Sequence, residues 1–279
     1  DLFITGPDAF RALSEHGVNS FQNFSPDIAK QYVAVNQDGY YVGDGILFYL
    51  ADGEFDLVSN ASVANWVEYQ LNNGGYDLRV ERDNNSNRRK GPPKLYRYEL
   101  QGPTAGPLVE KLIGAPLPKV KFFHMTELNI GGRKTRALRH GMAGQPGFEI
   151  FGPWEEGEEV LDAIVEAGKE FDLHLVGSRA YSTNALESGW IPSPLPAVYT
   201  DERMRSYREW LPVKSYESSG PIGGSFVSDD IEDYYVTPHD IGYGPFVKFD
   251  HDFIGREALE KIADQPHRRK VTLVWNADD

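Results

Sequence analysis

The chain contains no cysteine among its 279 residues. This absence excludes disulfides, thiolate nucleophiles, zinc–thiolate sites and iron–sulfur clusters. No apolar run approaches the roughly 18 residues that span a bilayer, so the sequence predicts no membrane partner and a cytoplasmic location. The seven histidines show no metal-ligand spacing, and neither a Walker loop nor a Gly-x-Ser-x-Gly motif is present. We therefore predict no metal site, no phosphate-binding loop and no serine hydrolase triad.

Positive charge is also scarce. The chain carries 28 Lys and Arg against 42 Asp and Glu, for a net charge of −14. Nucleic acid is therefore not an expected partner, because phosphate neutralisation requires clustered basic residues. One basic cluster exists, Arg88-Arg89-Lys90. It indicates either a solvated loop or a loop that attracts an anionic ligand tail. The oligomeric state is left open.

Strand patterns dominate the first third of the chain. Residues 31–60 hold apolar runs separated by Gln-Asp-Gly, Gly-Asp-Gly and Ala-Asp-Gly, and Asp-Gly between such runs is a hairpin signal. Residues 61–75 have helical spacing and end in Gly74-Gly75. Strand alternation is also present in the first six residues and in the last ten, 270–279. Both ends are abrupt, which predicts missing terminal segments.

Residues 45–172 have a predicted order of strand, helix, three strands and helix. This order resembles a ferredoxin-like module, and it makes the chain an α+β protein. Domain boundaries follow changes of motif alone, and no internal repeat is visible in the sequence.

The stretch GSRAYSTNALESGWIPSPLP, residues 177–196, lacks the apolar periodicity of a core element. It places Tyr181, Glu187 and Trp190 within ten residues and then continues with three spaced prolines. A hydroxyl, a carboxylate and an aromatic ring in one such segment suit a site for a flat, polar heterocycle.

Three motifs carry a resemblance to a known family: HGMAGQPGFEIFGP (140–153), SRAYSTNALESGW (178–190) and GYGPFVKFDHDFIGREAL (242–259). With the Gly-Asp-Gly around Asp44, they resemble the folate-binding aminomethyltransferase family, which includes the glycine cleavage T-protein. Longer stretches are similar to its tetrahydrofolate-dependent aryl O-demethylases, which act on vanillate, 3-O-methylgallate or syringate.

The resemblance implies a T-protein-like folate-binding fold, a cloverleaf of three modules around a folate channel. It divides the chain into residues 1–44, part of domain 1, and 45–172, the ferredoxin-like domain 2. Residues 173–240 would return to domain 1, and 241–279 would begin a C-terminal β-domain.

The resemblance also implies roles in folate binding. An ionised carboxylate accepts from adjacent N–H donors of the pterin edge, and Glu187 is the first choice for this, with Glu149 the second. Trp190 either stacks on a ring or anchors the core. Lys248 either meets the carboxylate tail of folate or is an exposed lysine. Asp44 either shapes the pocket near the reactive amine or is an ordinary turn aspartate.

Tyr181 matches the tyrosine that the O-demethylases use to protonate the departing aryl oxygen. Its unperturbed pKa of about 10 is close to that of a phenol, which suits proton donation. Asn60 stands where vanillate-type members carry an arginine for the substrate carboxylate. An amide can hydrogen-bond a carboxylate but cannot neutralise it, so the aromatic acid is left open.

The sequence thus predicts a methyltransferase that moves a methyl group from a methoxylated aromatic acid to tetrahydrofolate. Its small-molecule partners are the aryl ether and the folate, and the products are 5-methyltetrahydrofolate and a phenol. Two alternatives stay open: an aminomethyltransferase of the glycine cleavage type, and a non-catalytic folate-binding module.

Overall fold

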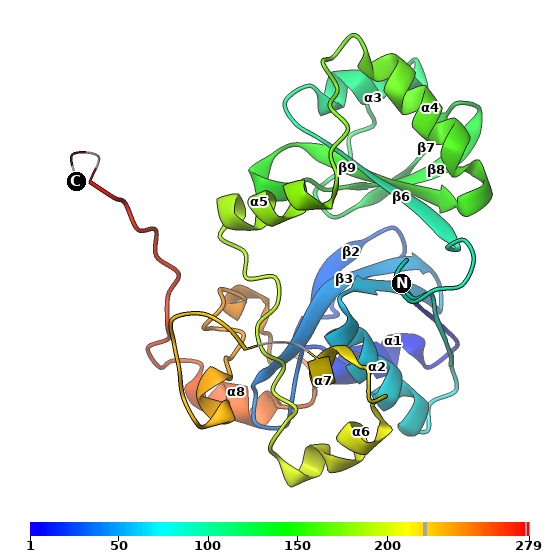
Figure 1. The fold of residues 1–279 in the computed structure, drawn as a ribbon. Helices are drawn as coiled ribbons and strands as arrows, with labels where there is room; N and C mark the ends of the chain where they lie inside the picture. The colour runs from blue at the N-terminus through cyan, green and yellow to red at the C-terminus, as the bar shows by residue number, and fades with distance from the viewer. Residues whose placement is uncertain (220–221, 277, 279) are drawn as a thin grey trace.

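Two antiparallel sheets stack face to face, and helices cover the outer face of each (Figure 1). The structure, a computed structural model, describes residues 1–219, 222–276 and 278. The layers run helix, sheet, sheet, helix. This arrangement buries the apolar side of every helix against a sheet and gives the chain two helix-covered cores, one in each module.

The first module holds a five-stranded sheet in the order β2-β3-β4-β1-β5. Its elements are β1 (Leu2–Thr5), α1 (Ala9–His16), β2 (Ala29–Val35), β3 (Tyr41–Ala51), β4 (Glu54–Ser59), α2 (Ala61–Asn73) and β5 (Arg79–Arg82). Leu13 of α1 and Trp66 of α2 are buried against Tyr32 and Leu47 of the sheet. The apolar spacing that predicts α2 therefore marks the helix face that packs on the sheet.

The second module holds a four-stranded sheet in the order β6-β9-β8-β7. Its elements are β6 (Leu95–Gln101), α3 (Ala105–Ile113), β7 (Met125–Ile130), β8 (Arg133–Arg139), β9 (Gly147–Pro153) and α4 (Gly157–Gly168). Leu108 of α3 and Ile164 of α4 pack on Ile150. The helix α3 ends at Gly114, whose positive φ of 66° places it in the left-handed region that terminates helices.

The two modules repeat one topology, strand–helix–three strands–helix. In both modules a Gly-Pro pair precedes the first helix, and its glycine has a positive φ: Gly6 at 141° and Gly102 at 124°. The expectation of no internal repeat is therefore wrong at the level of the fold. Few side chains are identical at equivalent positions of the two modules. The repeat is one of backbone topology and polarity pattern, and a comparison of residue identities does not detect it.

A pseudo-twofold axis relates the modules. Ile28 and His124 form an isolated antiparallel bridge, and each stands at the same place in its own module. Ala29 N–H donates to the carbonyl of Phe123, and Met125 N–H donates to the carbonyl of Asp27, both at 2.8 Å. Asp27 and Phe123 also share a positive φ, at 65° and 59°. The contact is thus self-complementary, as in an isologous interface.

Apolar side chains fill the space between the sheets, with Phe48 and Ala29 from the first module against Phe151 and Leu138 from the second. The two sheets pack against each other through this cluster, to which β3 contributes Ile46, Phe48 and Leu50. The predicted boundary between residues 44 and 45 falls inside β3, and residues 45–172 combine part of the first module with all of the second.

The rest of the chain lies along the side of this double layer (Figure 1). It contains α5 (Ser178–Ser188), α6 (Arg205–Trp210), α7 (Tyr216–Ser219) and α8 (Arg256–Ile262), with 3-10 turns at Glu202–Met204, Ile231–Tyr234 and Gly244–Phe246. Two further 3-10 turns, Met142–Gly144 and Trp154–Glu156, flank β9 in the second module. Within it, Ile241, Val247 and Leu259 pack on Val33 and Tyr41, which forms a third core on the first sheet.

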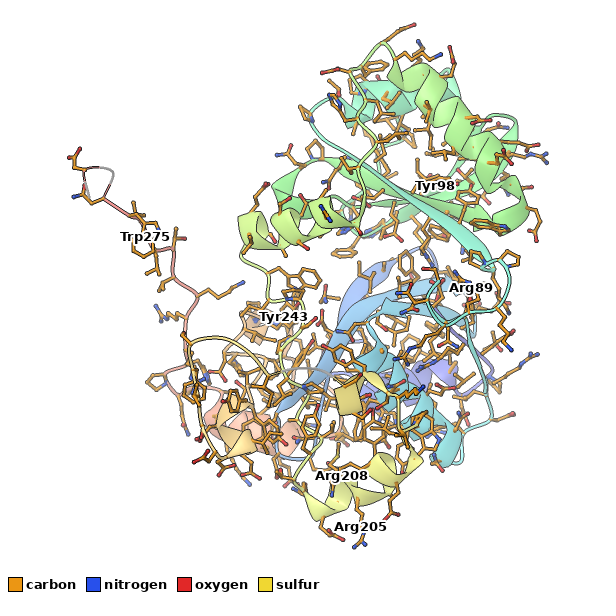
Figure 2. The ribbon with its side chains drawn as sticks, viewed as in Figure 1. Arg89, Tyr98, Arg205, Arg208, Tyr243 and Trp275 are labelled. Carbon is orange, nitrogen blue, oxygen red and sulfur yellow. The ribbon has the colours of Figure 1, made fainter. Side chains whose placement is uncertain are left out.

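The predicted hairpins are confirmed in two of three places. Gln37-Asp38-Gly39 joins β2 to β3, and Ala51-Asp52-Gly53 joins β3 to β4. Gly43-Asp44-Gly45 is instead continuous strand inside β3, so the turn alternative for Asp44 is wrong. Residues 270–276 form no strand, and Figure 2 shows Trp275 on an extended segment outside the folded body. No described helix is long and apolar enough to cross a membrane.

Candidate functional site

Asp44 is a buried carboxylate in the middle of β3, with 5% of its surface exposed. Side chains alternate along a strand, so Asp44 shares a face with Phe48, which packs against the second module. Its oxygens accept hydrogen bonds from the amide of Gln31 and the hydroxyls of Tyr41 and Tyr243. Burial raises the pKa of this carboxyl, and the three donors oppose the rise. Such a group can hold or release a proton.

Glycines on both sides of Asp44 let other backbone approach β3 closely. A Cβ at Gly43 would stand 2.7 Å from the backbone nitrogen of Val63, at the start of α2. A Cβ at Gly45 would stand 2.5 Å from the Cβ of Ser59 in β4. Neither position tolerates a side chain without displacing a neighbour. The two glycines of the Gly-Asp-Gly motif therefore make room for the start of α2 and the end of β4, while the Asp44 side chain lies on the opposite face of the strand.

Trp190 reaches this carboxylate through Tyr243. The indole N–H of Trp190 donates to the Tyr243 hydroxyl at 2.5 Å, and that hydroxyl donates to Asp44 at 3.0 Å. Trp190 is half-buried against the third core, with Ile241 and Val247. The structure therefore joins three of the segments singled out in the sequence: Gly-Asp-Gly, the stretch of Trp190, and GYGPF. Tyr243, Tyr41 and Gln31 were missed because no local pattern links them to Asp44.

Asn60 is the N-cap of α2. Its side-chain oxygen accepts from the Ser62 hydroxyl at 2.8 Å and from the Ser62 N–H at 3.2 Å. N-cap asparagines satisfy helix donors in this way, and this explains why α2 begins at Ala61. The amide N–H₂ group of Asn60 makes no hydrogen bond to the described residues. A donor therefore remains available at this end of α2, close to Gly43.

Glu187 lies on the exposed side of α5, and its carboxylate makes no ion pair within the described part of the chain. The helix ends at Gly189, at φ 61°, whose N–H returns to Ala185 and Leu186. Tyr181 belongs to the same helix, but its side chain lies outside what the structure describes. Glu187 is three residues before Trp190, so it is linked to the Asp44 network by the chain and by no described contact.

Glu149 points into the space between the two sheets. Nη1 of Arg97 donates to it at 2.8 Å, and the same guanidinium pairs with the fully buried Asp56. Arg97 also stacks over Phe48 and Phe151, at 4.9 and 4.7 Å from the ring centroids. Burial raises the pKa of Asp56 to about 6, and Arg97 opposes that rise. Glu149 is thus engaged in an ion pair within the second sheet, and the same arginine links that sheet to Asp56 of the first.

Lys248 is exposed after the 3-10 turn at Gly244–Phe246, and its backbone N–H donates to Val18 at 2.9 Å. The structure does not bring its side chain to Asp44. In the basic cluster, Arg89 pairs with Asp83 at 2.7 Å and Arg88 donates to the carbonyl of Lys214. These contacts hold the loop to the body. The described residues contain no group of three potential ligands for a metal ion.

These features define an α+β protein with a double-module core and a carboxylate-centred site beside it. The fold is that of the glycine cleavage system aminomethyltransferase T from Bartonella henselae, at a TM-score of 0.64 and 19% identity over 94% of this chain and 60% of that one. The family model described as "GCVT N-terminal domain" matches residues 1–193, and the chain belongs to this family. The resemblance inferred from the motifs is confirmed.

Two curated relatives extend the comparison. The chain is 49% identical to a syringate O-demethylase from Sphingobium sp. (strain NBRC 103272 / SYK-6), over 100% of this chain and 61% of the relative. It is 33% identical to a sesamin methylene transferase from Sinomonas sp. (strain No.22), over 99% and 59%. The chain therefore spans about three fifths of the length of these relatives.

Proposed function

We propose that this chain is the folate-binding part of an enzyme that transfers a methyl group from a methoxylated aromatic acid to tetrahydrofolate. The observation that carries the proposal is the convergence of Trp190 and Tyr243 on the buried Asp44. Similarity to a syringate O-demethylase along the whole chain supports the aryl ether as substrate. Syringate and related methoxylated acids are therefore the substrates to test first.

The chemistry requires two proton movements. Bound tetrahydrofolate supplies the amine nitrogen that accepts the methyl group. The aryl oxygen–methyl bond breaks as the methyl–nitrogen bond forms, the amine loses its proton, and the aryl oxygen gains one. Asp44, whose pKa is raised by burial, is suited to accept the amine proton. Tyr181 is proposed to protonate the departing oxygen, so that the free phenol leaves.

The proposed folate contacts use the remaining candidates. Glu187 would accept from the pterin edge, with Glu149 as the second choice, although its ion pair with Arg97 makes it less available. Trp190 would present its ring face to the pterin or the aryl group. Lys248 would meet the carboxylate tail. Glu187 and Lys248 are exposed and have no ion pair among the described residues, so both side chains are available to a ligand.

The decisive experiment incubates the full-length protein with tetrahydrofolate and syringate, or with vanillate, and measures the phenol and 5-methyltetrahydrofolate. Both products should appear in equal amounts, and absence of both would contradict the proposal. We expect Glu187→Ala to weaken folate binding in calorimetry, with Glu158→Ala on α4 as the matched control. Unchanged affinity for folate would remove Glu187 from the pterin site.

Tyr181 distinguishes this function from aminomethyl transfer, the activity named for more distant relatives such as one from Caldanaerobacter subterraneus subsp. tengcongensis, which is 28% identical. Cleavage of a carbon–nitrogen bond has no aryl oxygen to protonate. We expect Tyr181→Phe to abolish demethylation and to retain folate binding. Full demethylation by this variant would exclude Tyr181 as the acid.

A further inference from the structure

A pocket of about 190 Å³ opens beside the start of β3, and three tyrosines line it: Tyr199, Tyr216 and Tyr234. Leu195, Pro196 and Ile222 form the aliphatic part of its wall. The pocket is therefore a small space with aromatic walls and hydroxyl groups. Such a lining suits a flat ring that carries oxygen substituents.

The walls of this tyrosine pocket are tied to the strand that carries Asp44. Ala197 N–H donates to the carbonyl of Tyr41, and Tyr41 N–H donates to the carbonyl of Val236, both at 2.8 Å. The segments on either side of the pocket thus flank the first residue of β3. The Tyr41 hydroxyl donates to Asp44, so the pocket lies next to the Asp44 network.

Two of the three hydroxyl groups already have partners. Tyr199 donates to the carbonyl of Glu217 at 2.9 Å, and the Tyr234 hydroxyl accepts from the N–H of Ser228 at 2.8 Å. Tyr216 makes no hydrogen bond to the described residues. Burial, then Glu217 and Tyr216, raise the pKa of Tyr199 to about 12, which is consistent with a Tyr216 phenol close to the Tyr199 phenol. Tyr216 is therefore the hydroxyl that a ligand can engage.

The volume restricts what the tyrosine pocket can hold. An apolar cavity of about 150 Å³ accommodates benzene, so 190 Å³ accommodates one substituted ring. A pteridine joined to an aminobenzoyl group contains three rings and exceeds this space. The pocket therefore matches the single ring of an aromatic acid better than the whole of a folate.

We propose that the tyrosine pocket receives the aromatic ring of the methyl donor and that the Tyr216 hydroxyl positions it by hydrogen-bonding an oxygen substituent of the ring. This proposal rests on the proposed function for the identity of the ring. The placement also brings the donor next to the Asp44 network, where the methyl acceptor is proposed to lie. Tyr216 is thus a substrate-positioning residue, a role different from the proton donation proposed for Tyr181.

The test measures binding of syringate and, separately, of tetrahydrofolate to the full-length protein by calorimetry. Tyr216→Phe should weaken syringate binding about fivefold, the loss expected for one hydrogen bond, and leave folate binding unchanged. Leu195→Trp should fill the pocket and abolish syringate binding. Tyr98→Phe is the matched control, because Figure 2 shows Tyr98 in the second module and its hydroxyl donates to Gly157.

Wild-type syringate affinity in both Tyr216→Phe and Leu195→Trp would overturn the proposal, and so would absence of syringate binding to the unmodified protein. The readouts separate it from the proposed function. If the pocket variants still transfer the methyl group with the wild-type KM for syringate, the proposed function is supported and the pocket is not the site of the aromatic ring. If the variants weaken syringate binding but even the unmodified protein transfers no methyl group, the pocket proposal is supported and the proposed function is contradicted.

Discussion

The hydroxyl of Tyr243 donates a 3.0 Å hydrogen bond to Oδ2 of Asp44 across 199 residues of chain. This bond joins the segment after α7 to the centre of β3. Removing it in Tyr243→Phe should lower the free energy of unfolding by about 1 kcal/mol. It should also raise the pKa of Asp44 further, because a donor that stabilises the charged carboxylate is lost. Carbon-13 NMR titration of the carboxyl would measure the shift, and an unchanged pKa would contradict this role.

Arg97 is expected to be the most sensitive charged residue of the interface between the modules. Arg97→Leu leaves Asp56 and Glu149 buried without their partner, which should cost about 3–5 kcal/mol in chemical denaturation. Arg205→Leu is the matched control. Arg205 is exposed in Figure 2, and its pairs on the helix surface contribute little. If Arg97→Leu and Arg205→Leu lower the free energy of unfolding equally, the buried pairs of Arg97 contribute no more to stability than surface pairs do.

The Arg97 cluster also sets a pH dependence. The folded pKa of Asp56, about 6, is above its ordinary value, so the folded state binds more protons than the unfolded state between these values. Stability due to Asp56 is therefore present at low pH and is lost as pH rises through about 6. Asp56→Asn should remove this loss, and equilibrium unfolding at several pH values would reveal it. If the free energy of unfolding of Asp56→Asn changes with pH as steeply as that of the unmodified protein, Asp56 is not the cause of the pH dependence.

His16 should act in the opposite direction. Burial lowers its pKa to about 4, so the folded state resists protonation that the unfolded state accepts near its ordinary pKa. Stability is then full above about 6.5 and falls by about 3 kcal/mol as pH drops to 4. His16→Gln should flatten this decline. The exposed His174 provides the control substitution, His174→Gln. If stability still declines at low pH in His16→Gln, another titrating group causes the decline.

Gly43 tests the close packing around Asp44. Gly43→Ala places a Cβ 2.7 Å from the Val63 nitrogen and should destabilise the protein by about 1–3 kcal/mol, because α2 must shift. Gly177→Ala is the control, since a Cβ there meets nothing within 4 Å. Thermal unfolding compares the two variants. If Gly43→Ala is as stable as the control variant, the close approach of α2 to β3 does not require glycine at position 43.

Several elements could be predicted from sequence because their signals are local. The helix at Ala61–Asn73 and the turn at Asp38-Gly39 follow from apolar spacing and turn chemistry within a few residues, whereas the capping of that helix by Asn60 was not predicted. The strand inside Gly43-Asp44-Gly45 was read as a turn by the same local rule. Its strand conformation comes from pairing on both sides, with β2 and β4, which the local pattern does not contain.

The candidate site was predictable only in part. Asp44, Trp190 and Asn60 could be named from motifs, but their partners could not. Tyr243 meets Asp44 because the third core holds its segment against β2 and β3, and that contact depends on packing between distant parts of the chain. Glu149 was predicted from its apolar strand to bind the pterin, whereas the structure pairs it with Arg97. That pairing follows from the placement of β6 beside β9 in one sheet, which brings together residues 52 positions apart.

The sequence by itself determined the α+β class, the family and Asp44 as a candidate site residue, because periodicity, turn residues and motifs act over short distances. The tertiary structure decided the repeat of two modules, the donors around Asp44 and the tyrosine pocket. These features depend on which surfaces meet when both sheets bury their apolar faces. Hydrophobic burial has no direction, so the partners that it brings together are fixed only when the whole core is packed.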